Sequence, residues 1–316
     1  TQRMPLFEEF TSSTCGPCAA NNPTFDAMLG NTQNDGKFAC VKYQMNWPGT
    51  GDIYYNNDGS SRRYYYGVNA IPDLWVDGGS AGAPANFTQS DFNNEYSNYA
   101  NVVIDAHYSW NGNTVTVYGT VNPLIDLTGT IRLYCALVEN PTHNNASSNG
   151  ENTFHYVEQK MLPTGNGTVM TSLTAGSSTP FSLTYDISNN THIEDWTNLR
   201  AMVWLQNVST KDVYQSAVAT WPTAINPVVK SSTGIIALYP TIATNNITVE
   251  YQLQNNSDVQ FCVENMLGET MITKADHFGF GLHTFTVDPS TLPSGNYFFV
   301  MNADGNKYLK EFIVTH

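Results

Sequence analysis

The segment Thr14-Cys15-Gly16-Pro17-Cys18-Ala19-Ala20 contains two cysteines separated by a glycine and a proline. Before it, Pro5 to Phe10 is a mostly apolar run typical of a short strand. After it, Ala19 to Leu29 is compatible with a helix, for which Gly30 is a plausible C-cap. The two cysteines are therefore expected at a strand-to-helix turn, at the N-terminus of the helix.

The N-terminus of a helix favours a thiolate, because unpaired backbone N–H groups and the positive end of the helix dipole lie there. In such a place the pKa of a cysteine falls from about 8.5 toward about 7 or below. We therefore expect Cys15 to be an exposed nucleophile. Cys18, one turn into the helix, is expected to be a buried resolving thiol.

A Cys-x-x-Cys pair can also form a structural disulfide or supply half of a metal site. A metal site usually needs a second Cys or His pair at similar spacing. The sequence has none, because Cys40, Cys135 and Cys262 stand alone and no two of the seven His are closer than six positions. We therefore expect no metal and no other cofactor.

Three further features favour redox chemistry. Glu9 lies six residues before Cys15 on the expected strand, where a buried carboxyl group can relay a proton to the resolving thiol. Lys42 falls on the next expected strand and is a candidate partner for Glu9. Ile71-Pro72 precedes an apolar strand, and its peptide bond is a good candidate for the cis form, because X–Pro bonds lose only about 0.5–1 kcal/mol by going cis.

With these residues the N-terminal part of the chain resembles thioredoxin-like proteins, and its Cys-Gly-Pro-Cys tetrad is identical to that of thioredoxin. The resemblance implies that Cys15 and Cys18 are the nucleophilic and resolving thiols. It also implies that Glu9 is the buried acid, which is usually Asp in the family. Pro72 would lie beside the disulfide, and the neighbouring backbone at Ile71 would hold the substrate.

Other residues are expected to form the substrate-binding surface. Gly16 and Pro17 belong to the tetrad, and Trp47 follows the second strand in a loop that tends to lie near a thioredoxin active site. One departure is Thr14, which stands where thioredoxins have Trp, so the docking surface is altered. A cluster rich in tyrosine is a candidate recognition surface or, more often in such cases, a cover over a sheet face; its members are Tyr54, Tyr55, Tyr64, Tyr65, Tyr66, Arg62 and Arg63.

The composition narrows the class of protein. The chain has 316 residues, enough for two or three domains, and a formal net charge of -14. Only 13 Lys and Arg are available to neutralise phosphates, which argues against a nucleic-acid partner. The low share of charged residues (13%), with abundant Asn, Thr, Ser and Gly, is typical of an extracellular β-rich protein.

No apolar run approaches the roughly 20 residues of a transmembrane helix. No secretory leader precedes Thr1, so we expect a signal peptide to have been removed or left out.

Strands alternate with helices over residues 1–101, which predicts an α/β thioredoxin-like domain. Asn57-Asp58-Gly59 is expected to interrupt or bend any helix in the segment before the cis-proline candidate. The expected elements are strand 6–11, helix 18–29, strand 38–46, a broken helical segment 52–66, strand 74–78 and helix 91–100.

Period-two alternation replaces helical periodicity after Asn101, and Asn111-Gly112 is a strong hairpin signal. This pattern predicts an antiparallel β-sandwich over residues 102–226. In the long connection that follows the third strand of the sandwich, His155 and Glu158 are candidates for an acid–base pair. A partly exposed His near a Glu is far more common as ordinary surface. The expected strands are 102–110, 114–121, 129–139 and 199–206.

The join of the thiol motif to a sandwich carrying Lys160-Met161-Leu162-Pro163 suggests a narrower family. Over roughly residues 1–222 the chain is similar to the outer-membrane-protein-twenty-eight-related proteins of bacterial cell surfaces. This resemblance implies a surface location more than it implies an activity.

A Pro- and Ser-containing linker is expected at 223–233, followed by a small all-β, Ig-like module at 232–316. The module resembles the C-terminal sorting domain of the type IX (Por) secretion system. The resemblance implies export through the periplasm of a Gram-negative bacterium, to the medium or the outer-membrane surface, and contact with the secretion machinery. Thr241-Ile242 stands where the family usually has Asn-Pro, and an ordinary accessory domain is the alternative. The motifs that carry the resemblance are Leu238-Tyr239-Pro240, Asn246 to Val249, Asn265 to Gly268 and Leu292 to Phe298.

The remaining thiols differ in their surroundings. Cys40 and Cys135 lie in apolar runs and are expected to be buried. Cys262 shares a strand face with polar residues and is expected to be exposed. None has a neighbour in sequence that suggests catalysis.

Two functions are compatible with the sequence. The first is a secreted or cell-surface thiol–disulfide oxidoreductase that acts on protein thiols or disulfides. The second is a non-enzymatic surface binding module in which Cys15 and Cys18 form a structural disulfide. Glu9 and Ile71-Pro72 favour the enzyme, whereas Thr14 and the tyrosine cluster favour the binding module.

Overall fold

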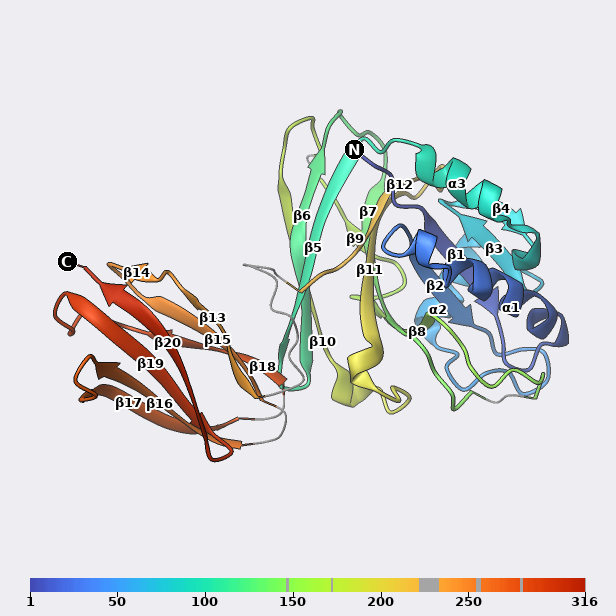
Figure 1. The fold of residues 1–316 in the computed structure, drawn as a ribbon. Coiled ribbons are helices and arrows are strands. Elements are labelled where there is room, and N and C mark those ends of the chain that lie inside the picture. Colours follow the sequence, from blue (N-terminus) through green and yellow to red (C-terminus); the bar gives the residue numbers. More distant parts are fainter. Residues whose placement is uncertain (146–147, 172, 222–232, 254–256, 279–280, 316) are drawn as a thin grey trace. The chain divides into compact units, whose positions relative to one another are not determined.

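The computed structural model describes residues 1–145, 148–171, 173–221, 233–253, 257–278 and 281–315. The chain forms two compact units (Figure 1). The first comprises Thr1–Ser109 and Val115–Trp221, and the second comprises Trp110–Thr114 and Pro222–His316. The linker predicted at 223–233 lies outside the described residues except for Thr233.

A large mixed sheet forms the centre of the first unit. Its strands lie in the order β12-β11-β7-β8-β2-β1-β3-β4, and β9 pairs with β7. β5, β6 and β10 form a separate three-stranded sheet. The bounds of the large sheet's strands are β1 (Leu6–Thr11), β2 (Ala39–Gln44), β3 (Asp73–Val76), β4 (Gly79–Gly82), β7 (Ile131–Glu139), β8 (Val157–Leu162), β9 (Thr168–Val169), β11 (Leu199–Asn207) and β12 (Val213–Val218). Those of the smaller sheet are β5 (Val102–Asn111), β6 (Thr114–Pro123) and β10 (Thr179–Asp186).

This architecture corrects the fold class expected from the sequence. The described residues are mostly β, in four sheets with few helices, and do not form an α/β thioredoxin-like domain followed by a separate sandwich. The reason is that β8 lies parallel to β2, with Val157 opposite Lys42, so the sheet continues beyond β2 into β7, β11 and β12. Alternation and apolar runs locate strands, but they do not say which sheet a strand joins.

Where the structure describes the first unit, it has three α-helices: α1 (Gly16–Leu29), α2 (Asn57–Tyr66) and α3 (Gln89–Ser97). The predicted interruption at Asn57-Asp58-Gly59 is wrong, because this segment begins α2. The side chain of Asn56 accepts hydrogen bonds from the N–H groups of Asp58 and Gly59, which is N-capping. Gly67 ends α2 in the left-handed conformation, at φ 76°. Short 3₁₀ helices cover Thr32–Asn34, Pro84–Asn86, Ile187–Asn189 and Trp196–Asn198.

Successive side chains of β1 point to opposite faces of the sheet, so the neighbouring residues Glu8 and Glu9 contact different elements. Phe7 packs in an aromatic cluster with Phe25 of α1 and Phe92 of α3, at ring-centroid distances of 5.6 and 5.8 Å. Phe10 and Glu8 face the opposite side, toward α2. Glu9 therefore lies on the α1 side of the sheet.

The second unit is built from two sheets packed around an apolar core. One sheet has the order β13-β15-β18 and the other β14-β20-β19-β16-β17. Rings of Tyr251, Phe261 and Phe299 lie in the core. The bounds are β13 (Gly234–Tyr239), β14 (Ile242–Ala243), β15 (Ile247–Leu253), β16 (Ser257–Asn265), β17 (Thr270–Phe278), β18 (Gly281–Val287), β19 (Gly295–Ala303) and β20 (Asn306–Val314). Across the part of the chain that the structure describes, no helix is both long and apolar enough to cross a membrane.

Candidate redox site

Cys15 and Cys18 form a disulfide at the turn between β1 and α1, as their place in the sequence predicts. Their Cα atoms are 5.2 Å apart. Cys15 is the N-cap residue of α1, and its Sγ lies 3.1 Å from the backbone N of Cys18. The sulfur of Cys15 is thus placed where backbone N–H groups would stabilise a thiolate after reduction.

Ile71 lies next to this sulfur. Its carbonyl oxygen is 3.7 Å from Cys15 Sγ, and the predicted cis peptide bond between Ile71 and Pro72 is confirmed. Contact between the Pro72 ring and the sulfurs stays a prediction.

The loop that contains Trp47 is tied to the same turn. The hydroxyl of Thr14 donates to the carbonyl oxygen of Pro48 (2.7 Å). Trp47 is half-buried, with the Arg63 guanidinium 4.4 Å from its ring centroid. Gly16 and Pro17 are exposed at the start of α1. The two central residues of the tetrad are therefore at the surface, whereas Cys15 and Cys18 are buried.

The predicted exposure of Cys15 is wrong, because the residue is only 1% exposed in the disulfide form. A distant loop holds the turn from outside. The Nδ2 of Asn149 donates to the carbonyl oxygens of Cys15 (3.1 Å) and Ser12 (3.3 Å), and its backbone N donates to Ser13 (3.1 Å). Cys18 is fully buried, as expected.

Glu9 and Lys42 are paired on neighbouring parallel strands, as the sequence indicates. Lys42 Nζ lies 2.8 Å from Glu9 Oε2, and both side chains are almost completely buried. Burial raises the pKa of Glu9 to about 7, although the charge of Lys42 lowers it. Burial lowers the pKa of Lys42, but the charges of Asp26 and Glu9 outweigh it, so the net shift is upward. Glu9 is therefore a carboxyl group that can gain or lose a proton near neutral pH.

Sequence reasoning missed Asp26, which is the second carboxylate on Lys42, at 2.6 Å. A signal was present, because Cys18, Asn22 and Asp26 are spaced by four positions and share one face of α1. Asn22 is a buried polar residue on that face, and its Nδ2 donates to Thr11 Oγ1 and Glu151 Oε1, both at 3.0 Å. Polar residues in a buried helical stripe indicate a functional or structural network.

The acid–base pair suggested for His155 and Glu158 is not assembled. His155 Nδ1 lies 2.8 Å from Asn140 Oδ1, whereas Glu158 Oε2 accepts a hydrogen bond from Asn56 (2.7 Å). Glu158 is buried, and burial raises its pKa to about 8. Each residue therefore serves a different local contact.

Three of the seven members of the tyrosine cluster are buried. Tyr54, Tyr66 and Arg62 are buried, and Arg62 binds the Glu8 carboxylate at 2.8–2.9 Å on the α2 side of the sheet. Tyr64 is 72% exposed. Tyr66 and Arg62 thus cover the sheet face, as the more ordinary of the two interpretations has it, whereas Tyr64 lies at the surface.

The other cysteines are all buried. This confirms the expectation for Cys40 and Cys135, whose thiol pKa values are raised by burial. The expected exposure of Cys262 is wrong. Its Sγ lies 3.7 Å from Thr273 Oγ1 on the adjacent strand β17, where the cross-strand neighbour contributes to its burial.

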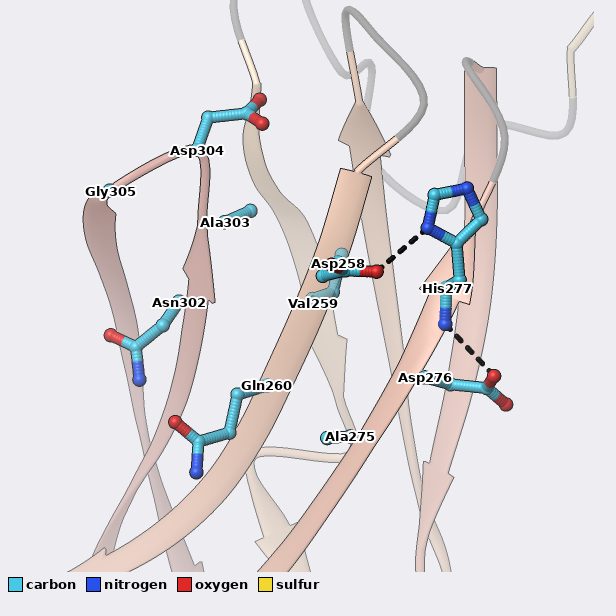
Figure 2. A pocket seen from close by; sticks show the side chains of 10 residues that line it. All are labelled: Asp258, Val259, Gln260, Ala275, Asp276, His277, Asn302, Ala303, Asp304 and Gly305. Atoms are coloured by element: carbon cyan, nitrogen blue, oxygen red, sulfur yellow. Dashed lines mark hydrogen bonds and ion pairs between the residues drawn. The ribbon is translucent and has the colours of Figure 1, made fainter.

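A pocket of about 510 Å³ lies on the second unit (Figure 2). His277 Nδ1 lies 2.8 Å from Asp258 Oδ1, and both side chains are largely exposed. Exposed pairs of this kind are weak, and the pocket lining contains no thiol. Within the described ranges, no cluster of three or more His, Cys, Asp or Glu residues could hold a metal ion.

Comparison with known protein families indicates where in the cell the protein is located. Residues 237–315 match the secretion system C-terminal sorting domain. This match indicates type IX secretion to the cell surface or outer membrane, and it implies that residues 237–315 interact with the secretion machinery.

Solved structures give a likeness in fold. HBP35 of Porphyromonas gingivalis is similar over 99% of both chains, with a TM-score of 0.57 and 14% identity. A domain of the outer membrane lipoprotein Omp28 from the same organism is 14% identical, with a TM-score of 0.29, over 40% of this chain and 93% of that one. At 14% identity, the similarity to HBP35 concerns the fold alone. A search of curated proteins found no match to the chain.

Proposed function

We propose that the protein is a thiol–disulfide oxidoreductase of the cell surface that acts on protein thiols or disulfides. The observation that carries the proposal is the Cys15–Cys18 disulfide at the N-terminus of α1, with the Ile71 carbonyl beside Cys15. The buried pair of Glu9 and Lys42 on the α1 side of the sheet supports it. A relation of residues 1–222 to the outer-membrane-protein-twenty-eight-related proteins belongs to the same proposal.

The reaction begins with the reduced pair. The Cys15 thiolate attacks a substrate disulfide, so that a Cys15–substrate bond forms, the substrate S–S bond breaks, and the released sulfur takes a proton. Cys18 then gives its proton to the Glu9 carboxylate and attacks Cys15 Sγ. The Cys15–Cys18 bond forms, the Cys15–substrate bond breaks, and the second substrate sulfur leaves as a thiolate that takes up a proton, so that two electrons have passed to the substrate. The reverse sequence oxidises a substrate dithiol.

Each residue has a separate task in this scheme. The helix N-terminus stabilises the Cys15 thiolate. The backbone at Ile71 and the exposed Gly16 and Pro17 form the surface on which a substrate chain lies. Glu9 accepts the proton of Cys18. Lys42 lowers the free-energy cost of burying the charged Glu9 carboxylate.

The test is reduction of insulin or glutathione disulfide by the reduced protein. Cys15→Ser should abolish turnover, and Cys18→Ser should accumulate a mixed disulfide through Cys15. Glu9→Gln should slow turnover without unfolding the protein, because the packing volume is similar. If the disulfide resists reduction in the folded protein and no variant alters disulfide turnover, the proposal is wrong.

One observation favours the second candidate, a surface binding module with a structural disulfide. Cys15 is 1% exposed, and buried disulfides are often inert. A reduction potential below about -300 mV would support that candidate, whereas a value nearer those of redox-active pairs would support the enzyme.

A further inference from the structure

Lys42 is shared between two carboxylates from different elements. It donates a hydrogen bond to Asp26 Oδ1 of α1 at 2.6 Å, and lies 2.8 Å from Glu9 Oε2 of β1. The second contact is a buried ion pair. The ammonium of Lys42 has three donors, so this one buried cation serves the carboxylates of both Asp26 and Glu9.

We propose that Asp26 is a positioning residue of the redox site, which holds Lys42 and thereby keeps Glu9 a proton acceptor for Cys18. The inference rests on the proposed function. It assigns a task to a residue that does not touch the substrate and acts through Lys42.

The charges around Glu9 support this assignment. Lys42 and Cys40 face it from β2, Asp26 from α1, and Glu151 from the loop that holds the redox turn. Burial raises the pKa of Glu9 most, Lys42 lowers it, and Asp26 and Glu151 raise it. A Glu9 bound to Lys42 without Asp26 would be an ordinary buried ion pair. The pKa of such a carboxylate would be lower than that of Glu9 beside Asp26, because one of the negative charges that raise it would be absent.

Asp26 also links the buried pair to solvent. Its side chain is 16% exposed, whereas those of Lys42 and Glu9 are 3% and 0% exposed. It lines a pocket of about 710 Å³ between α1 and the loop, together with Glu151 and His155. The position of Asp26 is fixed by the helix, because Asn22, one turn earlier, is bonded to β1 and to Glu151.

The experiment uses the full chain and three variants: Asp26→Asn, Asp26→Glu and Asp35→Asn. Asp35 is an exposed residue after the first 3₁₀ helix, and its variant makes the same change of charge outside the site. The first readout is the titration of the Glu9 carboxyl by NMR of ¹³C-labelled Glu, assigned with Glu9→Gln. The second is the pH dependence of glutathione-disulfide reduction.

Asp26→Asn should move the Glu9 titration to lower pH by about one unit, because a negative charge is lost and Lys42 can turn to Glu9. The acid limb of the pH–rate profile should move with it. Asp26→Glu should restore most of the wild-type titration, and Asp35→Asn should leave it unchanged. Asp26→Ala, a better helix former, is a second neutral variant if the Asn protein folds poorly.

The two proposals fail in different ways. A Glu9 titration that is the same in wild type and in folded Asp26→Asn or Asp26→Ala overturns the role of Asp26, whatever the turnover. A titration that moves as expected in a protein without disulfide turnover upholds the coupling to Lys42 and contradicts the proposed function. Since Asp26 is assigned a task in that function, its role in catalysis then falls as well.

Discussion

The side chain of Asn149 donates a hydrogen bond to the carbonyl oxygen of Cys15 at 3.1 Å, so a residue 134 positions further along the chain holds the redox turn. The same Nδ2 also contacts the Ser12 carbonyl oxygen, and the Asn149 backbone N donates to Ser13. The geometry of the disulfide turn therefore depends on a part of the chain outside the N-terminal motif.

Asn149→Ala should make the disulfide easier to reach. The variant loses the side-chain bonds to the turn, which together stabilise it by about 1 kcal/mol or more. We expect reduction by dithiothreitol to be several-fold faster than in wild type, measured by trapping free thiols over time. Asn152→Ala is the matched control, because Asn152 is exposed in the same loop. Equal rates in all three proteins would show that the loop does not restrict access.

Cys15 should be the most reactive thiol after reduction. It lies at the N-terminus of α1, whereas Cys40 and Cys135 are buried and have raised thiol pKa values. Iodoacetamide at about pH 7 should therefore modify Cys15 well before Cys18, Cys40, Cys135 or Cys262, as followed by peptide mass spectrometry. Labelling of Cys15 no faster than that of Cys18, with a thiol pKa near the unperturbed value of about 8.5, would contradict the activation by the helix.

Glu158 should make stability depend on pH. Burial is the main reason that its pKa rises from 4.5 to about 8. Between these values the folded protein retains a proton that the unfolded chain has lost, so the free energy of unfolding falls as the pH rises through this window. In Glu158→Gln, the part of this decrease in the free energy of unfolding that comes from residue 158 should be absent.

The measurement is urea unfolding followed by Trp fluorescence, at several pH values from about 4.5 to 8. The free energy of unfolding of Glu158→Gln minus that of wild type should become more positive as the pH rises. Glu95→Gln on α3 serves as the control for removal of a carboxyl group. A difference that stays constant with pH would refute a raised pKa for Glu158.

A truncation that ends near Pro222 should fold with unchanged disulfide chemistry, because the large sheet and the redox site lie within the first unit. It should fail to reach the surface of a host competent for type IX secretion, since residues 237–315 are removed. Surface display of the truncated protein can be followed by protease accessibility of whole cells. Efficient display would mean that the export signal lies elsewhere.

The sequence was sufficient for the local features of the site. The apolar strand before Cys15 and Cys18 and the helix-compatible segment after them placed the pair at the N-terminus of the helix, and consecutive strands brought Glu9 beside Lys42. It was insufficient for long-range pairing. Val157 lies opposite Lys42 across a parallel pair, and no periodicity within either strand specifies that neighbour.

Exposure was harder to predict than position. The burial of Cys15 involves a loop far along the chain, and that of Cys262 involves a cross-strand Thr273. A polar run on one strand face does not reveal what the adjacent strand places over it. Asp26 was missed for a related reason, since its importance depends on Lys42 from another element.

The distance in sequence between Cys15 and Asn149 also has a consequence for biosynthesis. A chain made from its N-terminus presents both thiols long before the ribosome reaches Asn149 or β8. During that interval the thiols meet whatever oxidants and reductants surround the nascent chain, without the cover that the folded protein has. The turn therefore gains the hydrogen bonds from Asn149 only after this later segment has been made, and until then its two thiols lack that cover.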